Sequence, residues 1–147
     1  MKWVVEEMKD WQSAAKQFLS KYPQGGVFGL SGDLGVGKTT FVRAVIKELA
    51  EREEKQAPRV LSPSFTILQS YVFQRASVDH FDFYRLENLN SSGLNEIGFW
   101  EACERVERDT SHYVLIEWPD KFQGQLPLMA KVQLKFSDSG RVMSVGS

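Results

Sequence analysis

Apolar residues near the start of the chain alternate between short runs and helical spacings. Residues 3–7, WVVEE, are consistent with a short edge strand, and Asp10 is the expected N-cap of the helix that follows. The segment YPQGG at 22–26 ends this helix, and the apolar run VFGLSG at 27–32 predicts a buried strand. One face of the predicted helix carries five apolar side chains: Trp11, Ala14, Ala15, Phe18 and Leu19.

A second helix is predicted directly after a glycine-rich segment. In residues 39–52, TTFVRAVIKELAER, the side chains of Phe41, Val45 and Leu49 recur at every fourth position. The segment before it, GDLGVGK at 32–38, contains three glycines. Glycine weakens a fold through its conformational freedom, so such a cluster indicates a place where the backbone itself must approach a ligand.

The second half of the chain predicts more strands than helices. Residues 65–73 and 76–84 are expected to form two antiparallel strands, and residues 97–108 a helix. The apolar run in SHYVLIEWPD at 111–120 predicts a buried strand, and residues 131–145 predict a hairpin. The chain is therefore expected to form an α/β sheet with an antiparallel portion. Two polar segments separate these elements, a surface loop at 53–60 and a turn-rich stretch at 86–96.

Length, charge and cysteine content narrow the class of protein. A chain of 147 residues with 42% hydrophobic residues fits one domain, 1–147, and 25% charged residues are typical of a soluble protein. The formal charge of −1 provides no overall attraction to nucleic acid or membrane. The single cysteine, Cys103, excludes an internal disulfide, and with His80 and His112 it makes too small a ligand set for structural zinc.

The N-terminal residues do not have the pattern of an export signal. The segment MKWVVEEMKD at 1–10 interrupts its apolar run with acids, so we expect no signal peptide. No stretch approaches the ~20 apolar residues that are needed to span a bilayer. We therefore expect a cytoplasmic protein that has no membrane partner.

The segment GDLGVGKT at 32–39 matches G-x-x-x-x-G-K-[ST], the Walker A pattern. Its glycines allow successive N–H groups to form a concave anion site at the N-terminus of a helix, where the dipole also favours anions. We expect Lys38 to contact the β- and γ-phosphates, Thr39 to ligate Mg²⁺ and Thr40 to reach the α-phosphate. The predicted nucleotide-binding loop comprises Gly32, Asp33, Leu34, Gly35, Val36, Gly37, Lys38, Thr39 and Thr40.

Two acids are candidates for phosphoryl-transfer chemistry, which needs a metal-side acid and a group that orients the attacking oxygen. Glu117 ends a hydrophobic strand, as in a Walker B strand, and is expected to ligate Mg²⁺ directly or through water. Asp82 lies in HFDFYRL at 80–86, where strand alternation places it on the same face as His80. The alternative for each acid is an ordinary surface position.

The segment LSPSFT at 61–66 is a candidate switch. Ser62, Ser64 and Thr66 supply hydroxyl groups around the rigid Pro63, in a loop after the predicted nucleotide-side helix. A segment in this place can sense a γ-phosphate. A plain turn is the alternative.

Together, four segments resemble the bacterial TsaE (YjeE-like) ATPases, which help to form threonylcarbamoyladenosine on tRNA. The segments are LSGDLGVGKTTF, SPSFT, HFDFYRL and LIEWPD, in the family's order, and they extend from residue 30 to residue 120. The combination of HxDxYRL with IEWP is more distinctive than the Walker A pattern alone. Two positions depart from the usual pattern: Val36, where alanine is usual, and Ser64, where threonine is common.

The resemblance implies a fold and an activity. The fold would be α/β and P-loop NTPase-like, with three layers, a central mixed sheet, helices on both faces and an antiparallel portion. The activity would be Mg²⁺-dependent ATP hydrolysis that is weak or absent in the protein alone and stimulated by docking to the TsaB–TsaD complex. The tRNA would be reached only through that complex.

The resemblance also implies roles for individual residues. Lys38 and Thr39 would bind phosphate and Mg²⁺, and Glu117 would serve the metal. Asp82 would position water or contact Mg²⁺ from its outer shell. Ser64 and Thr66 would be the switch residues that contact the bound nucleotide.

Three other classes of protein are alternatives to a TsaE-type ATPase. A GTPase is disfavoured because the chain has no Asn-Lys-x-Asp stretch to recognise guanine. A small-molecule kinase is disfavoured because EREEKQAPR at 51–59 is too acidic for a phosphate-clamping lid. A nucleotide-controlled binding module with incidental hydrolysis shares every motif, and only kinetics separates it from the ATPase.

Overall fold

The computed structural model describes residues 1–63, 66–86, 91–122 and 124–146. Its strands are β1 (Lys2–Val5), β2 (Gly25–Ser31), β3 (Leu68–Val72), β4 (Ser77–Asp82), β5 (His112–Glu117), β6 (Ala130–Phe136) and β7 (Arg141–Gly146). Its helices are α1 (Met8–Lys21), α2 (Lys38–Arg52), α3 (Ser91–Glu96) and α4 (Phe99–Arg108), with a 3₁₀ turn, η1, at Pro119–Phe122. None of the described helices has the length and apolar character needed to cross a membrane.

Two details of the predicted elements need correction. The helix α1 begins at Met8 with Glu7 as its N-cap, so Asp10 lies in the first turn and is not the cap. Its carboxylate accepts hydrogen bonds from the backbone N–H groups of Glu6 and Glu7, at 3.0 and 2.9 Å, which ties the preceding chain to the helix. The polar segment predicted to be turn-rich contains the short helix α3, because the buried Leu94 anchors it.

The seven strands of the described residues form one mixed sheet with the order β1-β7-β6-β2-β5-β4-β3. The strands β2, β5 and β4 are parallel neighbours, and β6 is parallel to β2. The pairs β3/β4, β6/β7 and β1/β7 are antiparallel. The α/β class, the mixed sheet and its antiparallel portion are therefore confirmed.

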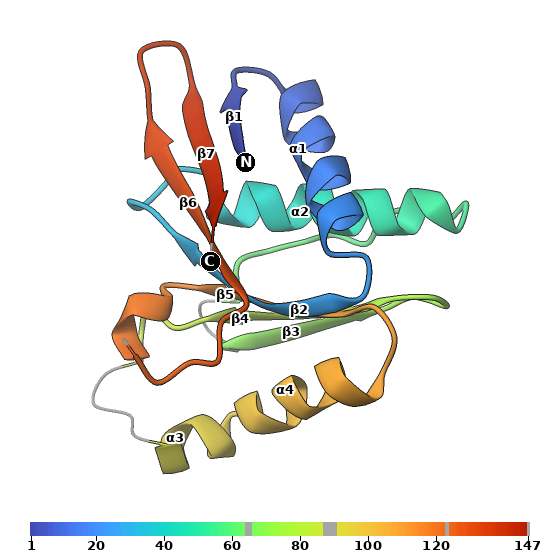
Figure 1. The fold of residues 1–147 in the computed structure, drawn as a ribbon, viewed down its shortest axis with the longest axis vertical. Helices are drawn as coiled ribbons and strands as arrows, with labels where there is room; N and C mark the ends of the chain where they lie inside the picture. The colour runs from blue at the N-terminus through green and yellow to red at the C-terminus, as the bar shows by residue number, and fades with distance from the viewer. Residues whose placement is uncertain (64–65, 87–90, 123, 147) are drawn as a thin grey trace.

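Helices cover both faces of the sheet (Figure 1). The side that faces α1 and α2 holds the larger apolar core, in which Phe18 packs against Phe28 and Phe41 at ring-centroid distances of 4.8 and 5.3 Å. The opposite side, which faces α3 and α4, holds a second core in which Phe81 contacts Phe99. This arrangement gives the three layers that the family resemblance implies.

The register of the parallel strands brings the predicted catalytic acids together. Leu30 of β2, Glu117 of β5 and Asp82 of β4 are paired positions in three adjacent strands. Because these strands are parallel, their carboxyl ends lie at the same edge of the sheet, where ligands bind in open α/β folds. The glycine-rich loop leaves β2 at that edge and leads into α2.

Candidate functional site

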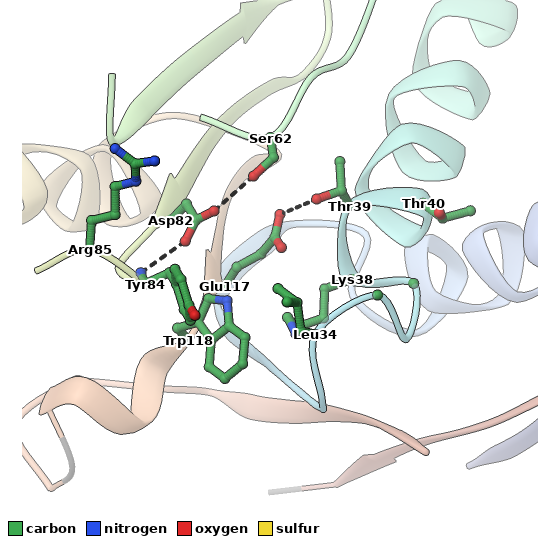
Figure 2. A pocket seen from close by; sticks show the side chains of 12 residues that line it. Leu34, Lys38, Thr39, Thr40, Ser62, Asp82, Tyr84, Arg85, Glu117 and Trp118 are labelled. Carbon is green, nitrogen blue, oxygen red and sulfur yellow. Dashed lines mark hydrogen bonds between the residues drawn. The ribbon is translucent and has the colours of Figure 1, made fainter. Parts of the chain in front are cut away.

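A cleft of about 400 Å³ lies at the carboxyl edge of β2, β5 and β4. Figure 2 shows side chains from the glycine-rich loop, α2, β4 and β5 converging on it. Its walls are formed by Leu34, Gly35, Gly37, Lys38, Thr39, Thr40, Ser62, Asp82, Tyr84, Arg85, Glu117 and Trp118.

The glycine-rich loop curves because its glycines adopt backbone angles that other residues avoid. Gly35 and Gly37 have φ values of 78° and 120°, in the region that favours glycine. Gly37 is the N-cap of α2, so the loop ends where the free N–H groups of the helix begin. Gly35 has open space where a Cβ would project. These features give the loop the shape and polarity of an anion site.

Lys38 is 4% exposed, and its ammonium group is held at the mouth of this loop. Nζ donates to the carbonyl oxygens of Gly32 at 2.6 Å and Asp33 at 3.1 Å. Burial lowers the pKa of Lys38, whereas the negative charges of Glu117, Asp82 and Asp33 act in the opposite direction. An ammonium group has three N–H donors, so two bonds to the loop leave one for a ligand.

Glu117 is 3% exposed and joins α2 to the sheet. Its Oε2 accepts a hydrogen bond from Thr39 Oγ1 at 2.8 Å and lies 2.6 Å from His80 Nε2. The other ring nitrogen of His80 is buried and has no partner among the described residues, so the proton of the neutral ring belongs on Nε2. His80 therefore donates to Glu117 and fixes the direction of its carboxylate.

Asp82 lies beside Glu117 and is 4% exposed. Ser62 Oγ donates to its Oδ2 at 2.8 Å, and the backbone N–H of Tyr84 donates to its Oδ1 at 2.9 Å. Figure 2 shows these two contacts on one side of the cleft and the contact between Thr39 and Glu117 on the other. The two carboxylates are thus oriented independently of each other.

An aromatic wall borders Lys38. The ring of Trp118 lies 4.0 Å from Lys38 Nζ and 4.9 Å from the ring of Tyr84, measured to ring centroids. Trp118 has a φ of 62°, an uncommon backbone angle for a residue with a side chain. This turn directly follows β5 and directs the indole over the ammonium group, where a cation–π contact is favourable.

The structure brings together most of the predicted site residues. Eight of them border the cleft: Leu34, Gly35, Gly37, Lys38, Thr39, Thr40, Asp82 and Glu117. Gly32 and Asp33 contribute the carbonyl groups that bind Lys38, and Val36 is fully buried. Thr66 borders a neighbouring hollow that also includes Ser62, and it is not among the residues of the cleft. Ser64 lies outside the described residues.

The sequence assigned no site role to Tyr84 or Arg85, gave Ser62 only a place in the candidate switch segment and named His80 only as sharing a face with Asp82. The alternation in HFDFYRL places His80 on the face of Asp82, but its contact with Glu117 depends on how β4 pairs with β5. Ser62 was only one of several hydroxyl groups in its loop. Tyr84 acts on Asp82 through its backbone, which no side-chain pattern can indicate.

Among the residues that the structure describes, no group of three or more His, Cys, Asp or Glu side chains is arranged to hold a metal ion. Cys103 is a free thiol on α4, and burial raises its pKa to about 12.

Known proteins resemble this chain over most of its length. It is 31% identical to the tRNA threonylcarbamoyladenosine biosynthesis protein TsaE of Rickettsia prowazekii, over 93% of this chain and 88% of that protein. It is 32% identical to the protein of the same name from Aquifex aeolicus, over 78% and 83% of the two chains. The crystal structure of YdiB from Bacillus subtilis superposes with a TM-score of 0.69 and 26% identity, over 99% of this chain and 83% of that one. Residues 5–143 match the family described as threonylcarbamoyl adenosine biosynthesis protein TsaE, and the chain therefore belongs to the TsaE family.

Proposed function

We propose that this protein is a Mg²⁺-dependent ATPase that serves tRNA threonylcarbamoyladenosine biosynthesis, weakly active alone and stimulated by TsaB- and TsaD-like proteins. One observation carries the proposal. The hydroxyl of Thr39 and the carboxylate of Glu117 meet at 2.8 Å beneath a glycine-rich loop that also holds Lys38. This is the arrangement expected of a site for a magnesium-bound triphosphate.

The loop has features that favour a polyphosphate ligand. The N-terminus of α2 supplies unpaired N–H groups and a positive dipole end. Lys38 is tethered by two carbonyl groups, so its charge is already placed before a phosphate arrives. A pre-positioned charge lowers the entropy that binding must remove.

The residues at the strand edge fit a magnesium ion. Mg²⁺ prefers hard oxygen ligands and keeps several waters, so one hydroxyl and one carboxylate from the protein are sufficient. Oε2 of Glu117 accepts from Thr39 and His80, whereas Oε1 accepts no hydrogen bond among the described residues. When bound, the metal would neutralise charge on the β- and γ-phosphates. Thr39 and Glu117 would hold it.

The second carboxylate would act on the attacking water. Asp82 is anchored by Ser62 and by the backbone of Tyr84, which hold its oxygens in place at the cleft. A water positioned by a fixed carboxylate attacks from a defined direction. Glu117 is the alternative for this role, because its Oε1 also has the capacity to accept a hydrogen bond from water.

Family membership supports the proposed partners. Proteins of the TsaE family belong to tRNA threonylcarbamoyladenosine biosynthesis. The rim of the cleft carries Leu34, 72% exposed, and Tyr84, 46% exposed, so a docking protein can reach it. The net charge of −1 offers no general attraction to tRNA, which would meet this chain only within the complex. The proposed site of action is the cytoplasm.

The experiment is an ATPase assay with and without the TsaB–TsaD pair. We expect slow release of inorganic phosphate from the protein alone and at least tenfold faster release with both partners. The variant Lys38→Ala should lose ATP binding in calorimetry and show no stimulation. Turnover that partners leave unchanged, with intact ATP binding, would instead favour a nucleotide-controlled binding module.

A further inference from the structure

The glycine-rich loop is supported by a residue that does not border the cleft. Arg141, the first residue of β7, donates from Nε to the carbonyl oxygen of Val36 at 2.8 Å, across 105 residues of sequence. Gly37 borders the cleft, but neither Val36 nor Arg141 does. Arg141 therefore contacts the loop from outside the ligand cavity.

The side chain of Arg141 is itself held in place. Its backbone is paired with Val5 of β1 and with Phe136 of β6, so it sits in the middle of three strands. The guanidinium carbon lies 4.4 Å from the centroid of the Phe136 ring, and Nη1 donates to the carbonyl oxygen of Gly140 at 3.2 Å. In Figure 1, β6 and β7 stand beside β1 and α1, away from the helices α3 and α4. A guanidinium fixed in this way is a rigid hydrogen-bond donor.

The bond to Val36 orients one peptide plane of the loop. The carbonyl of Val36 and the N–H of Gly37 belong to the same trans peptide, so they point in opposite directions. Arg141 holds the carbonyl from outside the cavity, and Gly37 borders the cleft, so a peptide held in this way can present the Gly37 N–H to the cleft. The φ of 120° at Gly37 lies in the region where glycine has unusual freedom, so this plane needs an external restraint.

A second contact limits the movement of the loop. A Cβ on Gly37 would lie 2.6 Å from the indole of Trp11, so the α1 side chain packs directly against this backbone. Trp11 restricts where Gly37 can move, whereas Arg141 restricts how its peptide can rotate. Without the Arg141 bond, a rotated peptide would present a carbonyl oxygen to the cleft, and this oxygen would repel a phosphate.

We infer that Arg141 is a positioning residue for polyphosphate binding, which holds the Val36–Gly37 peptide so that the Gly37 N–H faces a phosphate oxygen. The inference rests on the proposed nucleotide function of the cleft. It extends the site to the C-terminal hairpin, which no Walker motif includes. Arg141 touches the loop and not the ligand, so its effect belongs to affinity and not to the chemical step.

The test compares Arg141→Ala and Arg141→Lys with the control Lys135→Ala. Lys135 is an exposed residue of β6 and its loss changes the charge equally. Calorimetry with ADP and with ATP, both with Mg²⁺, should show about tenfold weaker binding for Arg141→Ala and less than twofold change for the control. Arg141→Lys should recover part of the loss, since its ammonium group can still donate to Val36. If Arg141→Ala does not fold, Arg141→Gln replaces it in the same measurement.

Two further readouts separate positioning from simple stability. The amide resonance of Gly37 should shift when ADP is added to the wild-type protein and shift less in Arg141→Ala. The KM for ATP should rise about tenfold in that variant while kcat stays within about twofold. A variant that melts earlier but binds ADP with wild-type affinity would overturn the inference.

The inference and the proposed function fail in different ways. If the wild-type protein binds neither ATP nor ADP, the nucleotide function fails and the role of Arg141 fails with it. If the wild-type protein binds nucleotide and Arg141→Ala binds it equally well, only the role of Arg141 fails.

Discussion

Two buried carboxylates on neighbouring strands have opposite surroundings. Glu117, at the cleft, accepts two hydrogen bonds on Oε2, and its Oε1 accepts none among the described residues. Asp79 of β4 lies on the other face of the sheet and accepts on both oxygens. Ser70 Oγ donates to its Oδ1 at 2.5 Å, and Arg105 and His112 contact its Oδ2 at 2.6 and 2.9 Å.

The histidines of the two regions differ in the same way. Both ring nitrogens of His112 have partners, since Nδ1 lies 2.6 Å from Ser77 Oγ and Nε2 contacts Asp79. His80 uses only one of its nitrogens. The Asp79 cluster (Ser70, Ser77, Asp79, Arg105 and His112) connects β3, β4, β5 and α4. Both carboxylate oxygens of Asp79 and both ring nitrogens of His112 have partners in it, whereas Nε of Arg105 has none among the described residues. A buried carboxylate can therefore either hold elements of the fold together or act in catalysis. The two roles differ in whether a carboxylate oxygen is still able to accept a hydrogen bond from a ligand.

The largest expected effect is on turnover at the cleft. Glu117→Gln keeps the shape of the side chain but removes the charge that would serve the metal. Partner-stimulated ATP turnover should fall about 100-fold or more, with ATP affinity changed much less. Single-turnover phosphate release measures this. Wild-type turnover in this variant would refute the metal role of Glu117.

The matched change in the Asp79 cluster should affect stability instead. Asp79→Asn removes the charge that faces Arg105 and disturbs three hydrogen bonds of a buried group. The free energy of unfolding should fall by about 2 kcal/mol, and kcat for the proposed ATP hydrolysis by the folded protein should stay within about twofold. Urea titration measures the first quantity. A strong loss of kcat without a loss of stability would mean that this cluster is not simply structural.

A smaller effect on turnover is expected at the second carboxylate of the cleft. Asp82→Asn should lower kcat about tenfold and leave ATP affinity within about twofold, because the residue would orient water and not bind phosphate. Ser62→Ala removes one of the two restraints on Asp82 and should have a weaker effect in the same direction. If Asp82→Asn only lowers the melting temperature, its proposed role is wrong.

The smallest expected effect is a difference in acid sensitivity. Burial acts to raise the pKa of Asp79, but hydrogen bonds from His112 and Ser70 and the charge of Arg105 outweigh it, and the net pKa is lowered. A carboxyl whose folded pKa is depressed contributes stability above its unfolded pKa of about 3.9. That contribution disappears as the pH falls through the folded value.

The acid effect is isolated by comparison with Asp79→Asn. The stability gap between the wild-type protein and this variant should be constant at neutral pH and narrow below about pH 4, because all other carboxyl groups are shared. Urea titrations at a series of pH values measure the gap. A gap that stays unchanged down to pH 2 would show that the charge of Asp79 does not stabilise the fold.

Local patterns were sufficient for the glycine-rich loop and for the elements other than α3, which lies in a segment predicted to be turn-rich. The spacing of Phe41, Val45 and Leu49 predicted α2, and the Walker A residues fall on the loop between β2 and α2. The position of Glu117 at the end of β5 was also predictable, because an apolar run that is followed by an acid and a proline indicates where a strand ends. These features depend on residues that are close to one another in the sequence.

Contacts between distant segments were not predictable in the same way. The bond between His80 and Glu117 spans 37 residues and requires β4 to pair with β5 in one register. The Arg141–Val36 bond requires β7 to lie between β1 and β6. The predicted N-cap of α1 was wrong by three residues, because Asp10 can accept backbone hydrogen bonds from inside the first turn as well as from the N-cap position. In each of these cases the hydrogen-bond partner is determined by how the fold places the segments, and not by residue type alone.

The position of β7 between β1 and β6 has a consequence for synthesis on the ribosome. The glycine-rich loop leaves the ribosome about a hundred residues before Arg141. The loop of a nascent chain therefore lacks the Arg141–Val36 hydrogen bond until β7 has been made. During that interval β1 also lacks its only neighbour in the sheet among the described strands. Under the proposed function, ATP would therefore bind the emerging chain less tightly and would stabilise it fully only once the last strand is translated.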